Sequence, residues 1–499
     1  MYSSLLDAQW RLYRGRAWCI AVTIAAACSN GTDPGDPPAE LLVSAPQGDL
    51  APGLPVSLAV TVQDAAGNRV RGSTIAITLA MRPNAQGARA DGTTTVNAVD
   101  GVAMFTDVRL SRAGRAFALE ASAGSLSGVS PFFDVRLRLG SISVTSAMAC
   151  GLSPLGDAYC WGRNATGGLG IGRGGDQARP ALVAGDLVFA QLDVGSASNI
   201  GGLFDGGACG VTVNGAAYCW GRNDFGQLGN GNVGVDSDSP VPVAGGLQFQ
   251  TVAAGHDHAC GLTLDGAIYC WGSNQQGRLG NGNIGVDSDE PEPVSGNLSY
   301  TALSVGGSDR SCGIASSGET YCWGGGGPSP LAGSSFVDIP TLVLGGVAFS
   351  TIEPGSFLHL CGVGNDTGYC WGQDAGGELG TGTPGEHEPA PAPVAGGYEW
   401  TYIGAGAQAS CGLRTDGIVM CWGFDHNGEL GQGSVGNGRT VPSAIAGGIT
   451  FTQLSVGLGT SCGLISNGEA YCWGAGLWGE RGDGTLHPQQ GMPTKVVMP

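Results

Sequence analysis

Apolar residues in this chain fall in short runs that Gly, Pro, Asn and Asp interrupt. In the segments "SLAVTVQDAAGNRV" (57–70) and "TIAITLAM" (74–81), apolar and polar residues alternate with the period of a half-buried strand. Beyond the first thirty residues, no segment repeats apolar residues at the spacing of an amphipathic helix. The pattern therefore predicts an all-β protein.

One pattern with a period of about 50 residues recurs from residue 136 onward. Each repeat has four apolar stretches, which in residues 249–298 read "FQTVAA", "HACGLTL", "AIYCWG" and "PEPV". Four short strands in each of seven repeats predict a seven-bladed β-propeller. The segment "PTKVVMP" (493–499) has no repeat after it, and we expect residues 494–498 to complete the first blade and close the ring. The tryptophans that mark the repeats are Trp161, Trp220, Trp271, Trp323, Trp371, Trp422 and Trp473.

Every repeat carries two cysteines around a turn signal, such as Asp265 with Gly266, or Asn365 with Asp366 in the fifth repeat. The turn places both cysteines opposite each other on antiparallel strands, at a separation that a disulfide accepts. The spacing is not that of a redox motif, and two cysteines supply only half of a zinc site. We therefore expect structural disulfides and no metal. The predicted pairs are Cys150–Cys160, Cys209–Cys219, Cys260–Cys270, Cys312–Cys322, Cys361–Cys370, Cys411–Cys421 and Cys462–Cys472.

The N-terminal segment resembles a lipoprotein-type signal peptide over residues 1–28. Three arginines precede the apolar run "AWCIAVTIAAAC" (17–28), which is too short for a stable transmembrane helix. The resemblance implies lipid attachment at Cys28, and ordinary secretory cleavage nearby is the alternative. Residues 29–40 are rich in Pro, Gly and Asp, which is typical of a tether.

Two resemblances cover the rest of the chain. Residues 41–135 contain no cysteine and resemble bacterial immunoglobulin-like domains of the invasin type, which implies an N-terminal β-sandwich. Residues 136–499 resemble the repeats of the regulator of chromosome condensation family, in a disulfide-bearing bacterial form, most fully at "YCWGRNDFGQLG" (218–229). That family includes a nuclear guanine-nucleotide exchanger and secreted bacterial β-lactamase inhibitors, so the resemblance implies a propeller whose face can bind unrelated proteins.

Charge and cysteine usage narrow the possible partners and the location. The formal net charge of −19 disfavours sequence-independent nucleic-acid binding, which needs Lys and Arg to neutralise phosphates. Paired cysteines at this density are typical of an oxidising compartment. We expect a monomer without a cofactor, located in the bacterial cell envelope as an outer-membrane or cell-surface lipoprotein, or secreted, and touching the membrane only through its lipid anchor.

Candidate binding residues come from the segment before the first cysteine of each repeat, because this segment varies while the scaffold repeats. We expect these positions on one face of the ring near its axis, as a polar arc over three adjacent repeats, with an aromatic tip on an insertion in the second repeat. The partner-binding candidates are Asp257, His258, Asp309, Arg310, His359 and Phe204, and further anchors are Phe225, Phe424 and Trp478.

Catalytic motifs such as Gly-x-Ser-x-Gly or His-Glu-x-x-His do not occur in the sequence. We therefore expect a binding module for another macromolecule, an envelope or secreted protein or a glycan, and not an enzyme. Two alternatives stay open, a carbohydrate-active enzyme that uses Asp257 and Asp309, and a structural envelope protein. The acidic loops "NVGVDSDSP" (232–240) and "NIGVDSDEP" (283–291) are solvated turns or, alternatively, calcium sites.

Overall fold

The computed structural model describes residues 36–195, 206–306, 310–325, 336–355, 359–385 and 387–499. Within these ranges nearly all regular structure is β-strand, and the only helix is the 3-10 turn Ala244–Gly246 (η2). None of the described residues forms a helix that is long and apolar enough to cross a membrane. The expected all-β fold is confirmed.

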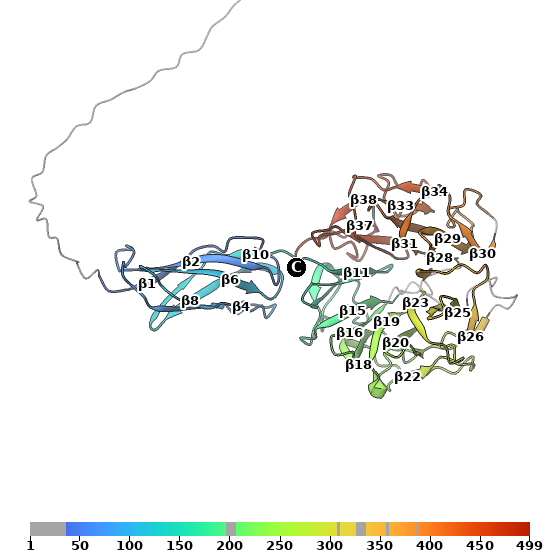
Figure 1. The fold of residues 1–499 in the computed structure, drawn as a ribbon, viewed down its shortest axis with the longest axis horizontal. Helices are drawn as coiled ribbons and strands as arrows, with labels where there is room; N and C mark the ends of the chain where they lie inside the picture. The colour runs from blue at the N-terminus through green and yellow to red at the C-terminus, as the bar shows by residue number, and fades with distance from the viewer. Residues whose placement is uncertain (1–35, 196–205, 307–309, 326–335, 356–358, 386) are drawn as a thin grey trace, which may run out of the picture.

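The N-terminal part of the described chain consists of two packed four-stranded sheets, seen in blue at one side of Figure 1. One sheet has the order β1-β2-β6-β4, the other β5-β3-β8-β9, and β7 pairs with β10. Along β2 buried residues alternate with half-buried ones, and along β6 mostly with exposed ones; the buried residues of both strands meet in one core between the sheets. The strands are Glu40–Val43 (β1), Pro55–Gln63 (β2), Ala76–Met81 (β3), Ala90–Gly92 (β4), Thr95–Asn97 (β5), Val102–Leu110 (β6), Gly114–Phe117 (β7), Leu119–Ala123 (β8), Leu126–Val129 (β9) and Phe133–Val135 (β10).

The remaining described strands form seven four-stranded antiparallel sheets arranged as a ring (Figure 1). Each sheet takes its strands in sequence order from the axis outward. The first, innermost strands are Ser141–Val144 (β11), Phe189–Val194 (β15), Phe249–Ala254 (β19), Tyr300–Val305 (β23), Thr351–Pro354 (β27), Trp400–Ala405 (β31) and Gln453–Val456 (β35). The second strands are Met148–Leu152 (β12), Gly207–Thr212 (β16), His258–Thr263 (β20), Arg310–Ala315 (β24), His359–Gly364 (β28), Ala409–Arg414 (β32) and Thr460–Leu464 (β36). The third strands are Ala158–Gly162 (β13), Ala217–Gly221 (β17), Ile268–Gly272 (β21), Thr320–Gly325 (β25), Thr367–Gly372 (β29), Val419–Gly423 (β33) and Ala470–Ala475 (β37). The fourth, outermost strands are Gln177–Leu182 (β14), Ser237–Pro242 (β18), Ser288–Pro293 (β22), Phe336–Leu342 (β26), Glu388–Pro393 (β30), Arg439–Ala444 (β34) and Gln489–Lys495 (β38).

Second and third strands form the predicted cysteine hairpins. The two cysteines of each hairpin lie directly opposite each other, with Cα atoms 4.0 to 4.1 Å apart, so all seven pairs are at disulfide distance as predicted. Gly266 has a φ of +88°, and Asn365 and Asp366 have φ of +49° and +59°. These left-handed conformations are the ones that the two turn types require.

The hydrophobic core of the ring lies between adjacent sheets. Trp220 of the second sheet packs on Phe189, with ring centroids 5.8 Å apart, and belongs to one buried cluster with Met148 of the first sheet. Tryptophan side chains also link neighbouring sheets, because the indole N–H donates to a backbone carbonyl in the preceding repeat. Trp271 Nε1 donates to Gln227 O over 3.0 Å, and the same bond is made by Trp161, Trp323, Trp422 and Trp473.

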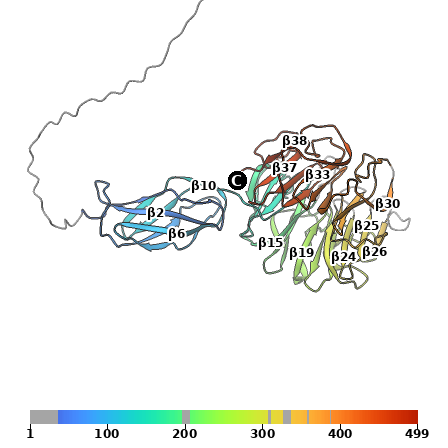
Figure 2. The ribbon, with the colours of Figure 1, turned by 45° about the horizontal axis from the view of Figure 1, so that its top comes forward.

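The ring closes by packing of the last sheet against the first, not by a shared sheet. Our prediction that residues 494–498 complete the first blade is wrong, since β38 pairs with β37 of its own sheet and β14 supplies the fourth strand of the first sheet. The last and first sheets share a buried cluster, and Trp161 Nε1 donates to Glu480 O over 2.9 Å. Figure 2 shows β37 and β38 beside the start of the ring. Each repeat builds a complete sheet, so closure needs no exchanged strand.

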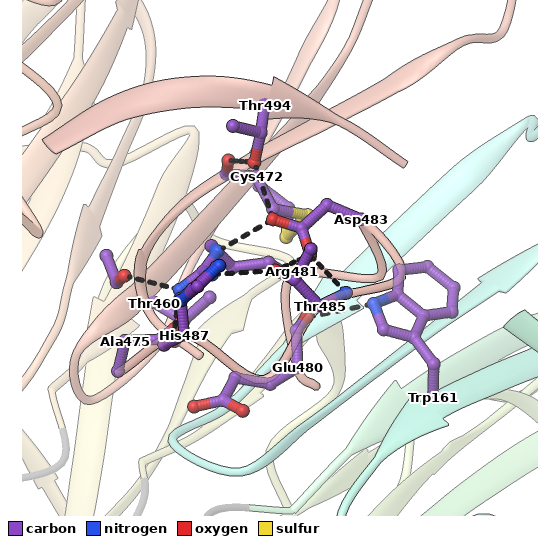
Figure 3. Close-up of polar contacts among 12 residues, drawn as sticks. Trp161, Thr460, Cys472, Ala475, Glu480, Arg481, Asp483, Thr485, His487 and Thr494 are labelled. Carbon is purple, nitrogen blue, oxygen red and sulfur yellow. Dashed lines mark hydrogen bonds and ion pairs between the residues drawn. A yellow bond between two sulfur atoms is a disulfide. The ribbon is translucent and has the colours of Figure 1, made fainter. Parts of the chain in front are cut away.

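The seventh repeat differs from the others at two buried positions of the loop between its third and fourth strands (Figure 3). Where five other repeats have a buried leucine, this repeat has Arg481, which is 1% exposed. The guanidinium donates to His487 O over 2.9 Å and to Asp483 Oδ2 over 3.1 Å. Where those repeats have Asn or Asp, this repeat has Gly476, and a Cβ there would overlap Nη1 of Arg481. The glycine therefore provides the space that the arginine occupies.

Candidate interaction face

The two ends of the strands form two different faces of the ring. In an antiparallel sheet built in sequence order, the connections alternate between the two strand ends. We call loop face the face with the first-to-second and third-to-fourth connections. We call hairpin face the face with the cysteine hairpins and the connections between sheets. The predicted residues Asp257, His258, Arg310 and His359 belong to the first-to-second connections or the strand starts after them, and thus to the loop face.

The N-terminal unit contacts the hairpin face at the first sheet and at the connection from the first to the second sheet. Arg112 of the N-terminal unit lies 3.4 Å from Asp157 in the first hairpin and 2.5 Å from Asp186 in the connection to the second sheet. The N–H of Ala113 donates to the Tyr159 hydroxyl over 3.2 Å, and burial raises the pKa of Tyr159. These contacts cover part of the hairpin face and leave the loop face to other molecules.

Asp257 is the centre of a charged cluster on the loop face. Its Oδ1 lies 2.9 Å from His256 Nδ1 and 3.2 Å from Arg222 Nη1, and its Oδ2 lies 3.7 Å from Arg278 Nη1. Arg222 also pairs with Asp224 over 2.6 Å. The cluster joins the third-to-fourth loops of the second and third sheets to the first-to-second loop of the third. Its members are half-buried except for Asp224, which is exposed, and Arg278, which is buried.

Electrostatics keep Asp257 ionised. Burial raises its pKa, but the hydrogen bond from His256 and the positive charges of Arg222 and Arg278 outweigh burial, so the net pKa is lowered. A general acid of a glycosidase needs the opposite shift. Asp257 is therefore unsuited to act as a general acid, and its ion pairs join loops of the second and third sheets.

His258 and His359 are not available to a partner, and their assignment to the binding surface is wrong. Their exposures are 1% and 2%, and each side chain lies against a serine of the next sheet. His258 Nε2 is 2.9 Å from Ser311 Oγ, and His359 Nε2 is 3.0 Å from Ser410 Oγ. Each histidine begins a second strand and points between sheets, because strand residues alternate in direction and the cysteine two positions later points the same way.

The burial of these histidines lowers their pKa values. Burial, with the charge of Arg278 as a further cause, lowers the pKa of His258 to about 3, and burial lowers that of His359 to about 4. Both are therefore neutral at physiological pH and link adjacent sheets. The sequence held one signal of this role, since the repeat after each histidine has serine directly before its first cysteine.

The remaining candidate residues either lie at other places in the ring or lie outside the described residues. Arg310 is half-buried at the start of β24, where it pairs with Gly324 of the neighbouring strand. Phe204 and Asp309 lie outside the described residues, and so does the lipid-attachment residue Cys28. Among the described candidates, the structure places Asp257 in a polar cluster accessible from the loop face and buries His258 and His359 between sheets.

The third-to-fourth loops bring further side chains to the loop face. Trp478 of the seventh sheet stacks with Arg163 of the first, with 4.3 Å from the guanidinium carbon to the ring centroid. Arg222 lies over Phe225 at 5.8 Å, and Phe424 stacks on His426 with centroids 5.1 Å apart. The three aromatic candidates are thus half-buried on this face, each beside a cationic or aromatic partner. Sequence reasoning missed Arg163 and Arg222, although both stand two residues after a repeat tryptophan.

The acidic loops 232–240 and 283–291 have structural roles in the turns. Asp236 Oδ1 accepts from the N–H of Asn223 over 2.9 Å, and Asp287 Oδ1 accepts from that of Asn274 over 2.7 Å. Among the residues that the structure describes, no group of three or more His, Cys, Asp or Glu is placed to hold a metal ion. Asp236 and Asp287 therefore fix the turns in which they stand.

An axial cavity of about 390 Å³ is lined by all seven first strands. Two carboxyl groups that sequence reasoning missed point into it and join adjacent sheets. Asp193 accepts from Ser143 Oγ over 2.8 Å, and Glu353 accepts from Ser304 Oγ over 3.0 Å. Burial raises the pKa of Asp193, and it raises that of Glu353 to about 7. Both acids lie in ordinary strand sequences, so no local signal distinguishes them.

Comparison with known proteins identifies the repeat. A family model for the regulator of chromosome condensation (RCC1) repeat matches residues 214–262 and 265–313, and a second model of this repeat matches residues 249–278 and 400–429. The mitochondrial RCC1 domain-containing protein RUG3 of Arabidopsis thaliana is 29% identical over 354 residues, which cover 63% of this chain and 77% of that protein. The ultraviolet-B receptor UVR8 of the same plant is 27% identical over 348 residues, which cover 66% of this chain and 75% of the receptor.

Solved structures show the same fold. Human WBSCR16 superposes with a TM-score of 0.60 at 21% identity, covering 69% of this chain and 94% of that one. Yeast RCC1 (Prp20), in its complex with Kap60, superposes with a TM-score of 0.59 at 20% identity, covering 72% and 85%. The chain thus contains RCC1 repeats and has an RCC1-like propeller.

Proposed function

We propose that this protein is an exported binding module that recognises another macromolecule, in the first instance a protein, through the loop face of a seven-bladed propeller. One observation carries the choice of face. The described contacts of the N-terminal unit fall on the hairpin face, whereas the loop face presents the cluster around Asp257 and the Trp478–Arg163 pair. Half-buried aromatic and arginine side chains are the types that dominate binding energy in protein interfaces.

The known behaviour of similar propellers agrees with a protein partner. Yeast RCC1 has been solved bound to Kap60, and Prp20p has been characterised for binding to Gsp1p and histones. Kap60, Gsp1p and histones are partners of those yeast proteins. The present chain has a net charge of −19, and we propose that it binds a different partner. We propose that the protein is a monomer, binds neither a cofactor nor nucleic acid, and has no catalytic activity.

The proposal includes export and attachment. Seven cysteine pairs at disulfide distance support an oxidising compartment. In the proposed arrangement, lipidated Cys28 and the tether hold an immunoglobulin-like spacer at the bacterial outer membrane or cell surface, and the propeller extends from the spacer. The bacterial origin, the lipid and the spacer role belong to the proposal, and mass spectrometry of the mature N-terminus tests lipid attachment at Cys28.

The test of the binding face uses the full oxidised chain as bait for envelope and secreted fractions. The loop-face variant is Trp478→Ala, and the matched control is Leu264→Ala, which removes a 71% exposed residue from a cysteine hairpin on the opposite face. We expect a specific protein to be retained by the wild type and the control and lost by the loop-face variant, with unchanged melting temperatures. Equal retention by all three baits, or loss only with Leu264→Ala, would contradict the proposed face.

A further inference from the structure

Four aliphatic side chains in the third-to-fourth loops of the second and third sheets are exposed to solvent. Val233 and Val235 are 55% and 66% exposed, and the corresponding Ile284 and Val286 are 49% and 63% exposed. Exposed aliphatic groups in neighbouring loops are typical of interaction surfaces. We call residues 230–242 and 281–293 the acidic rim.

The charge of the rim is strongly one-sided. Its 26 residues include six carboxylates and no Lys or Arg. The carboxylates are Asp236, Asp238, Asp287, Asp289, Glu290 and Glu292. The corresponding segment of the sixth sheet carries Arg439 and no carboxylate, and that of the first sheet carries Arg173 and Arg179 with one carboxylate, Asp176. The second and third sheets therefore form an acidic sector of the ring, to which a basic partner is attracted.

Hydrogen bonds hold the two loops of the rim together and in shape. The N–H of Gly231 donates to Asp289 O over 2.9 Å, which joins the second-sheet loop to the outer strand of the third sheet. The bonds from Asn223 to Asp236 and from Asn274 to Asp287 fix each loop to its own sheet. A preorganised surface loses little conformational entropy when it binds.

The outer strands β18 and β22 are unsuited to pairing with an added strand. Pro240 and Pro242 in β18 have no backbone N–H, and the same holds for Pro291 and Pro293 in β22. Proline on an edge strand is a known device against strand addition. A partner must therefore be recognised by side chains, through apolar contact and charge.

From these observations, we infer that the acidic rim docks a polypeptide segment of the partner in which aliphatic and Lys or Arg side chains alternate. The aliphatic side chains cover Val233, Val235, Ile284 and Val286, and the cations pair with the surrounding carboxylates. The near-identical loops act as two equivalent subsites, so that one segment gains from contacting both. This inference rests on the proposed function and specifies its partner chemistry.

The experiment measures fluorescence anisotropy of a labelled peptide of alternating valine and lysine with the full oxidised chain. We expect binding that weakens several-fold between about 50 mM and about 300 mM salt, because screening reduces attraction between exposed charges. Peptides of alternating serine and lysine, or valine and glutamate, should bind at least about tenfold more weakly. The double variant Val235→Ser/Val286→Ser should lose at least about tenfold in affinity.

The matched control is Val435→Ser in the corresponding loop of the sixth sheet, where the valine is 40% exposed. This control should bind the valine–lysine peptide like the wild type. Absence of binding, equal binding of the serine–lysine peptide, or unchanged binding by the double variant would each overturn the inference. If partner capture still depends on Trp478 in that case, the proposed function stands and only the rim is refuted.

Discussion

The packing of Arg481 against Gly476 in the seventh sheet can be tested by substitution. The change Gly476→Ala adds one methyl group at a residue whose φ lies outside the left-handed region, so the backbone itself accepts alanine. The new Cβ would overlap Nη1 of Arg481, whose guanidinium is buried and donates to His487 O, Asp483 and Thr485 over 2.9 to 3.3 Å. Displacing it takes the guanidinium away from His487 O and from the half-buried Asp483, which still accepts from Thr485. Loss of one partner from a fully buried ion pair costs about 3–5 kcal/mol, and because Asp483 is half-buried we expect a loss at the lower end of that range or below it.

The assay is denaturant unfolding of the oxidised chain, followed by tryptophan fluorescence, for Gly476→Ala, Arg481→Leu and the double variant. Leucine is the residue that five other repeats carry at this position. In the Arg481→Leu background the overlap with the guanidinium is gone, but the new Cβ still lies 2.6 Å from His487 O, so alanine at position 476 should cost less than in the wild type without becoming neutral. The double-mutant cycle should therefore give a coupling of at least about 1 kcal/mol. Gly175→Ala, which places its methyl group in open space, is the control for loss of glycine. Additive effects, or a cost near zero for Gly476→Ala alone, would refute the reasoning.

Three further changes test other features of the structure. Because the pKa of His359 is about 4 in the fold and 6.5 when unperturbed, the unfolded chain takes up a proton that the folded chain rejects. This histidine should therefore lower the free energy of unfolding by up to about 1.4 kcal/mol per pH unit as pH falls from 6.5 to 4, about 3 kcal/mol in total. In urea titrations at several pH values, His359→Gln should reduce the pH dependence by this amount and leave the contribution of His258, whereas the exposed His426→Gln should not reduce it. Replacing both Cys361 and Cys370 by serine should cost about 2–3 kcal/mol on the chain-entropy estimate for a loop of this size, and an unchanged urea midpoint would contradict a stabilising disulfide. Arg112→Ala should loosen the N-terminal unit from the ring and broaden the distance distribution in small-angle scattering. Arg115→Ala, in the strand β7 that follows Arg112, should leave the distribution as it is.

The local features of the fold could be predicted because they depend on residues close in sequence. A turn signal between two cysteines determines which residues oppose each other. About 50 residues of sequence therefore predict the cysteine pairs, the turn conformations of Gly266 and Asn365, and the four strands of each repeat. The position of the candidate residues before each first cysteine, on one end of the strands, follows from the same alternation of connections.

The features that could not be predicted depend on contacts between repeats. Whether His258 faces a partner or the serine of the next sheet depends on a neighbour 53 positions away. The distinction between the two faces depends on where the N-terminal unit rests, through contacts such as Arg112 to Asp186. Asp193 and Glu353 also could not be predicted. Each stands in an ordinary strand sequence, and the axial cavity that they line forms only when the ring is assembled.

The sequence by itself determined a chain of repeats with cysteine-paired hairpins, because strand alternation and turn geometry act over a few residues. Only the tertiary structure decided which side chains lie between the sheets, which face stays accessible and how the ring closes. The physical reason is that each repeat is a complete sheet with two apolar faces, and the partner of each face is supplied by another part of the chain.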